Sequence, residues 1–97
     1  MTNAHHLATL LREARALLAR PDNDFDWSSW EDSVHALTEV DALIARLETG
    51  DCPPELSISG LFAPTGRMQE VSLSSGWDDA FLDLAARIDA ALAAVYR

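Results

Sequence analysis

Three stretches of the chain repeat apolar residues at the three- and four-residue spacing of an amphipathic helix. This spacing predicts helices at about residues 3–20, 29–48 and 76–96. The strongest stripe is in the last of them and consists of Trp77, Phe81, Leu84, Ile88, Leu92 and Val95. Each helix has one apolar face to bury, so the three faces can enclose one core.

Serine residues stand where two of these helices should begin. Ser28 and Glu31 have the spacing of a capping box, and Ser75 and Asp78 repeat it before the last helix. In such a box the serine hydroxyl and the acidic side chain bind free backbone N–H groups of the first turn. Gly50 supplies a stop signal for the second helix.

The pattern changes after Gly50. A proline linker at 51–55 precedes Leu-Ser-Ile-Ser-Gly-Leu-Phe, which alternates apolar and small polar residues as a strand does. Residues 63–66 have Pro second and Gly fourth, as a type I turn prefers, and a second apolar stretch follows. We therefore expect an antiparallel β-hairpin at about 56–73. The predicted fold is α+β, mostly α: a single domain, 1–97, of order α–α–β–β–α, with three amphipathic helices packed against one hairpin.

The acidic loop at 21–28 and the residues just after it form the main candidate binding site. Aromatic side chains between carboxylates can anchor a partner protein, although a short chain also needs such side chains in its core. Burial of the aromatics is the favoured alternative. The predicted partner-binding set is Asp22, Asp24, Phe25, Asp26, Trp27, Trp30 and Glu31.

The alternation of Asp22, Asp24 and Asp26 resembles the opening of a helix–loop–helix calcium site. The sixth position, however, is Trp27 instead of the glycine that permits the sharp turn, and the twelfth is Ser33 instead of a bidentate glutamate. These three aspartates are weak candidates as metal ligands. We expect neither a metal nor another cofactor.

The chain is acidic, with 16 Asp and Glu against 7 Arg, no Lys, and a net charge of −9 over 97 residues. This charge argues against binding to nucleic acid, which requires basic clusters, and is compatible with a basic protein partner or simply with solubility. Abundant alanine and the absence of lysine point to a bacterial source. No apolar run is long enough to span a membrane, no signal-peptide pattern begins the chain, and Cys52 has no cysteine to pair with. We expect a cytoplasmic protein.

Two other functions stay open. Asp41 interrupts the apolar stripe of the second helix, so a small enzyme or ligand binder could be centred on Asp41, His35 and the tryptophans. No second carboxylate or nucleophile that would match Asp41 in a catalytic pair stands nearby in the sequence, and we therefore expect no catalytic activity. A homodimeric structural or regulatory protein, paired through the hairpin edge or an alanine-rich face, is the other alternative.

Two segments of the chain resemble parts of small uncharacterised bacterial proteins, a resemblance that implies no activity. They are FDWSSWEDSVHALTEVDALIARL and LFAPTGRMQEVSLSSGW. The general format, a small acidic cytosolic α+β protein without catalytic motifs, is similar to bacterial toxin-immunity and antitoxin-like inhibitors. That similarity implies a protein that binds and inhibits another protein.

Overall fold

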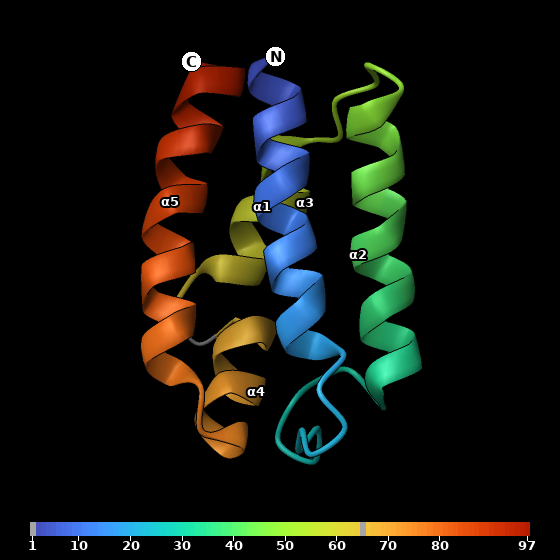
Figure 1. Ribbon diagram of the computed structural model, residues 1–97, viewed down its shortest axis with the longest axis vertical. Helices are drawn as coiled ribbons and strands as arrows, with labels where there is room; N and C mark the ends of the chain where they lie inside the picture. The colour runs from blue at the N-terminus through green and yellow to red at the C-terminus, as the bar shows by residue number, and fades with distance from the viewer. Residues whose placement is uncertain (1, 65) are drawn as a thin grey trace.

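A computed structural model describes residues 2–64 and 66–97, and every regular element within these two ranges is an α-helix. The α1 helix lies between α2 and α5, while α3 and α4 pack behind this layer (Figure 1). Both ends of the chain lie at one end of the molecule, and the loop between α1 and α2 lies at the other. The helices are α1 (Asn3–Leu18), α2 (Ser33–Glu48), α3 (Glu55–Phe62), α4 (Arg67–Ser75) and α5 (Asp78–Tyr96).

The central position of α1 explains its composition. Because α2 and α5 cover two of its sides, α1 buries a wider face than a helix with one neighbour. Two of its buried residues are alanines, which let the neighbouring helices approach closely. The hydroxyl of Thr2 caps its first turn by accepting from His5 N–H at 3.0 Å. The buried residues of α1 are Leu7, Ala8, Leu10, Leu11, Ala14 and Leu18.

The predicted β-hairpin, and with it the α+β fold class, is wrong. Residues 56–62 and 67–73 fall instead in two short helices, α3 and α4. The buried residues are Ile58, Leu61 and Phe62 in α3 and Met68, Val71 and Ser72 in α4. In each helix they are spaced i, i+3, i+4, the helical period, and the alternation in the sequence is incidental. The described ranges hold no strand edge to which a second copy could pair.

A close backbone contact folds α4 back beside α3. A β-carbon placed on Gly66 would lie 2.7 Å from the carbonyl oxygen of Gly60 and 2.8 Å from that of Ala63. Only glycine fits there, because neither carbonyl can move without disturbing α3. The Gly66 N–H also donates to the Ala63 carbonyl at 2.9 Å. The predicted turn thus joins two helices, and its Thr65 lies outside the described residues.

Two predicted helix starts are displaced. The α2 helix begins after Asp32, whose carboxylate accepts from His35 N–H at 2.9 Å, so the cap is Asp32 and not Ser28. Trp30 consequently precedes the helix. Ser75 does not cap α5 either, since its hydroxyl oxygen accepts from the backbone N–H of Asp24 at 2.9 Å. It therefore fastens the α1–α2 loop to the end of α4.

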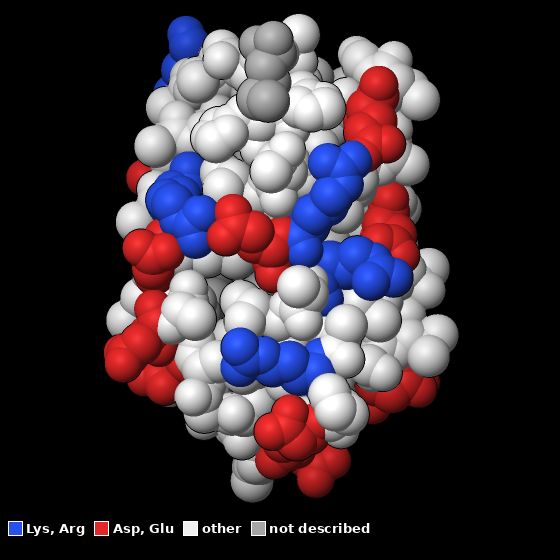
Figure 2. All heavy atoms as spheres, in the orientation of Figure 1, with Lys and Arg blue, Asp and Glu red and all other residues white. Residues whose placement is uncertain are grey.

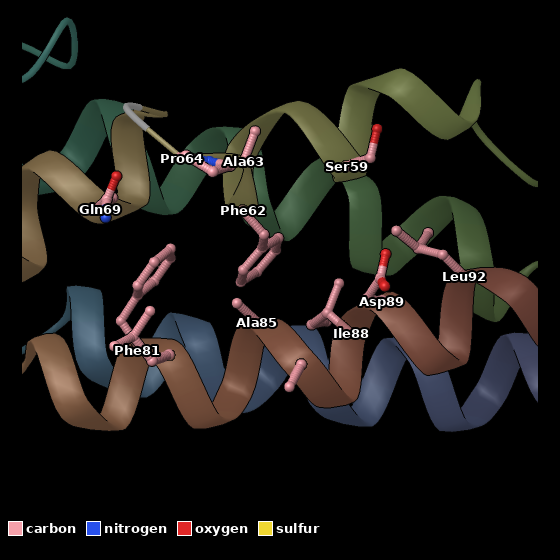
Figure 3. Close-up of a pocket in the computed structure, with 12 residues that line it drawn as sticks. Ser59, Phe62, Ala63, Pro64, Gln69, Phe81, Ala85, Ile88, Asp89 and Leu92 are labelled. Atoms are coloured by element: carbon pink, nitrogen blue, oxygen red, sulfur yellow. The ribbon is translucent and has the colours of Figure 1, made fainter.

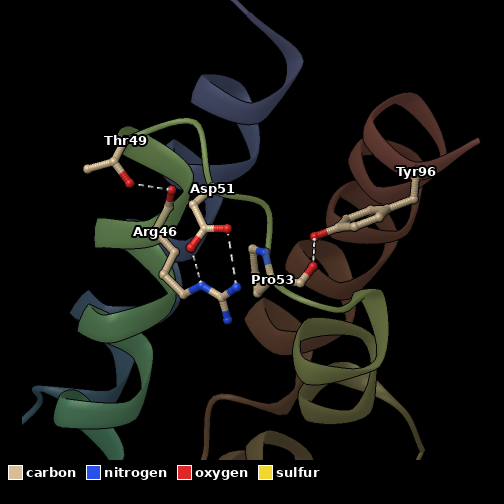
Figure 4. Close-up of polar contacts among 5 residues, drawn as sticks. All are labelled: Arg46, Thr49, Asp51, Pro53 and Tyr96. Carbon is tan, nitrogen blue, oxygen red and sulfur yellow. Dashed lines mark hydrogen bonds and ion pairs between the residues drawn. The ribbon is translucent and has the colours of Figure 1, made fainter.

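The linker between α2 and α3 is held on both sides (Figure 4). Arg46 of α2 contacts the Asp51 carboxylate through Nε at 3.1 Å and Nη2 at 3.4 Å. Tyr96, near the end of α5, donates its hydroxyl proton to the carbonyl of Pro53 at 2.6 Å. Its partial burial is the main factor that raises the pKa of Tyr96, with further contributions from negative charge on Cys52 and Glu55.

We expect opposite effects from alanine at two glycines. Gly66→Ala should lower the free energy of unfolding by about 1–3 kcal/mol, because the new methyl group meets two backbone carbonyls. Gly60→Ala should raise it by up to about 1 kcal/mol, since Gly60 lies inside α3 with no atom within 4 Å of an added β-carbon. Urea unfolding followed by circular dichroism measures both. Equal effects of the two substitutions would contradict the packing of α3 and α4.

Tyr96 is the only tyrosine, so its ionisation is visible in the ultraviolet absorbance of tyrosinate. Its pKa is raised above the ordinary value of about 10 in the folded protein. The stabilisation linked to the neutral phenol is therefore fully present below that value and is lost as pH rises through the raised pKa. We expect a higher midpoint in the folded than in the urea-unfolded chain. Tyr96→Phe should lessen the alkaline loss of stability, and identical midpoints would contradict the partial burial of the Tyr96 phenol.

Candidate functional site

The loop between α1 and α2 is anchored by Asn23. Its amide nitrogen donates to the carbonyls of Leu17 and Leu18 at 2.8 and 3.0 Å, where the end of α1 leaves acceptors free. Its amide oxygen accepts from Trp77 Nε1 at 2.8 Å. One half-buried side chain thus joins the loop to the end of α1 and the start of α5, and gives the acidic segment a defined position.

The three aromatic side chains of the α1–α2 loop differ in how far they are buried. Trp30 is fully buried in the core, and Phe25 is half-buried against it. Trp27, by contrast, is 75% exposed. Of these three side chains, only Trp27 offers most of its surface to a partner without rearrangement of the protein.

Trp30 has a structural role. The guanidinium of Arg67 lies 4.9 Å from the centre of the Trp30 ring, in cation–π geometry. The same guanidinium holds both carboxylate oxygens of Glu39, at 2.7 and 2.5 Å. Trp30 Nε1 completes the group by donating to Glu39 at 3.4 Å. These contacts connect the loop, α2 and α4, so Trp30 belongs to the scaffold and is not a contact residue.

Most ion pairs link one helix to another. Arg12 and Arg15 of α1 pair with Glu48 and Asp41 of α2, and further pairs join α5 to α1, α4 to α2 and α5 to α3. On the face formed by α5, α1 and α2, arginine and acidic side chains lie next to one another (Figure 2). Over this body of the molecule, positive and negative charges largely compensate.

The remaining negative charge gathers at one end. Six of the seven arginines pair with seven acids, which leaves nine of the sixteen acids without an ion pair within residues 2–64 and 66–97. Seven of these nine lie in the α1–α2 loop or in the first turn of α5, which the loop contacts. We call this surface the acidic end: Asp22, Asp24, Asp26, Glu31, Asp32, Asp78 and Asp79.

The residues proposed for a small enzyme do not converge. Asp41 is exposed, and its carboxylate oxygen accepts from Arg15 Nε at 2.6 Å, a hydrogen bond that raises the pKa of Arg15. His35 is exposed in the first turn of α2, where its Nδ1 accepts from the backbone N–H of Glu31 at 3.4 Å. Six residues on a helix correspond to about 600°, so the two side chains point about 120° apart. Asp41 therefore serves to join α2 to α1.

The three alternating aspartates do not form a cluster of ligands. Asp24 uses a carboxylate oxygen to accept from the backbone N–H of Asp26 at 2.9 Å, a local turn contact. Among the described residues, no group of three His, Cys, Asp or Glu is placed to hold a metal ion. The acidic end is a charged surface, and its geometry offers no coordination site.

The chain was compared with protein-family models, curated proteins and solved structures, and none of them matches. In the described part of the chain, no helix combines the length and apolar character needed to cross a membrane. A proposal of function therefore depends on the geometry of this molecule alone.

Two exposed apolar residues were missed because the hairpin prediction misplaced them. Leu56 of α3 and Leu73 of α4 are 78% and 62% exposed. In a hairpin, Leu56 and Leu73 would have been assigned to the packed face. Had residues 55–62 been treated as a helix, Leu56 would have fallen off its buried stripe, and an exposed apolar position would have been predicted.

The anchoring role of Asn23 can be tested against a second asparagine. Asn23→Ala should lower the free energy of unfolding by about 1–2 kcal/mol, because Trp77 Nε1 and two helix-end carbonyls lose their partner. Asn3→Ala removes one exposed contact, the 3.2 Å bond to the Ala94 carbonyl, and should change stability by less than about 0.5 kcal/mol. Urea unfolding measures both. Hydrogen exchange in residues 22–31 should rise only in Asn23→Ala, and an unchanged loop would contradict the anchor.

Proposed function

We propose that this chain is a protein-binding module whose acidic end docks on a basic surface of a partner protein, with Trp27 as the apolar anchor. One observation carries the proposal: the carboxylates without ion pairs gather at the end of the molecule that bears the exposed Trp27. Tryptophan at the centre of an interface is a frequent source of binding energy. Surrounding carboxylates favour a cationic partner and accelerate association.

The arrangement also favours binding over catalysis. The carboxylates of the acidic end lie on the surface around a loop, and the ion pairs of the body leave this end as the main site of uncompensated charge. A partner that brings lysine or arginine side chains would relieve the repulsion among these carboxylates. Covering a basic surface of that partner would block its other contacts, so inhibition is the natural consequence of docking. We also propose that the protein acts in the cytoplasm and needs no cofactor. Nucleic acid and membranes are not among the ligands that we propose for it.

The proposal is tested by affinity capture from the lysate of the source organism, with tagged wild-type protein and variants, at low and high salt. We expect a stoichiometric partner with a basic surface that salt releases, because ionic strength screens exposed charges. Once purified, that partner should lose at least about tenfold in affinity for Trp27→Ala, and a similar amount for the triple variant Asp22→Asn, Asp24→Asn, Asp26→Asn.

Leu56→Ala is the matched control, because Leu56 is as exposed as Trp27 but lies on α3, away from the acidic end. It should leave the affinity unchanged. A partner whose binding survives Trp27→Ala and high salt, or fails with Leu56→Ala instead, would show that another surface carries the function.

A further inference from the structure

A groove separate from the acidic end runs between α3 and α5. It has a volume of about 440 Å³, and it extends to the turn that joins α3 to α4. Phe62 and Phe81 stack in it with ring centres 6.3 Å apart and planes 4° from parallel. Figure 3 shows these rings between the ribbons of α3 and α5, with Ala85 and Ile88 facing them from α5. Apart from Asp89, the residues of α5 that line the groove are apolar.

Small side chains keep the groove open. Ala85 and Ala86 occupy the middle of the α5 wall, where a leucine would fill the space. Leu82, 57% exposed, extends the apolar wall at the Phe81 end.

The length of the groove matches a helix. The Glu55–Arg97 ion pair and the Phe62–Phe81 stack join opposite ends of α3 and α5, so the two helices run antiparallel as the walls. Along α5 the lining residues that are not buried extend from Leu82 to Asp89. Seven residues of helix rise about 10 Å, which is about two turns. An amphipathic helix of a partner places side chains i, i+3 or i+4, and i+7 into a groove of this length.

One charged residue of the groove indicates which charge the bound helix should carry. Among residues 2–64 and 66–97, Asp89 is the only charged one that lines the groove, and its carboxylate has no ion pair with any of them. A cation opposite Asp89 would complement it. A second copy of this chain would not: two copies each carry −9, and a two-fold pairing centred on the groove would bring Asp89 towards its own counterpart.

We propose that the α3–α5 groove binds an amphipathic helix of a partner protein, with apolar side chains over Phe62 and Ala85 and an arginine or lysine paired with Asp89. This surface is distinct from the acidic end. Its apolar contacts contribute affinity, and the single charge pair fixes the register of the bound helix. A partner with a helix of this kind next to a basic surface would engage both sites of the molecule.

The test uses a displayed library of helical peptides about 14 residues long, about four turns, selected on the wild-type protein. We expect enriched peptides with an apolar i, i+3/i+4, i+7 stripe and one basic residue beside it. Fluorescence anisotropy should then show that Asp89→Arg weakens them about fivefold or more. A peptide with glutamate in place of that basic residue should regain affinity for Asp89→Arg. Leu82→Gln, an exposed substitution, should also weaken binding.

Two matched controls show whether the peptide binds in the groove. Asp79→Arg at the acidic end and Leu73→Gln on α4 should leave peptide binding unchanged. Circular dichroism verifies that every variant is folded. Failure to enrich such peptides would overturn the proposal. So would peptides that bind Asp89→Arg and Leu82→Gln as well as wild type, or that respond to Asp79→Arg instead. Self-association in sedimentation experiments that Leu82→Gln abolishes would identify a second copy as the occupant and would likewise overturn it.

Discussion

The packing of α1 against two helices at once is the constraint on which the rest of the structure depends. Ala8 and Ala14 are fully buried, so α2 and α5 approach the α1 backbone closely along most of its length. Ion pairs also cross both the α1–α2 interface and the α1–α5 interface. With α1 enclosed, α3 and α4 are left to cover the remaining side of α5, and the long loop must cross the end of the bundle.

The long helices could be predicted from the sequence because their signals are local. Their apolar stripes run over four or more turns, and such a stripe fits one period only. The segments of α3 and α4 are eight and nine residues long, and a short apolar pattern fits a strand nearly as well as a helix. What decides between them is not local: the contact of Gly66 with the Gly60 carbonyl and the burial of Ile58 and Val71 beside α5. Periodicity carries no information about such contacts.

The candidate site was predictable in part for a similar reason. Composition located the acidic loop and its aromatics, since charge and aromatic content are properties of the sequence itself. Which tryptophan is exposed depends on partners elsewhere in the chain. Arg67, 37 residues later, lies over the ring of the buried Trp30. Within the described residues Trp27 has no such cation–π partner, and it stays at the surface. The groove could not be predicted, because it exists only when α3 is a helix and lies along α5.

The separation of compensated from uncompensated charge gives the molecule an electric dipole moment along its long axis. Six of the seven arginines pair with acids in the body, and most of the acids without an ion pair in the described residues lie at the end opposite the two termini. In the field of a cationic surface, such a molecule experiences a torque before any contact forms, and it turns its acidic end forward. Orientation during diffusion is thus built into the charge distribution, and it leaves both chain ends facing away from the surface that is approached.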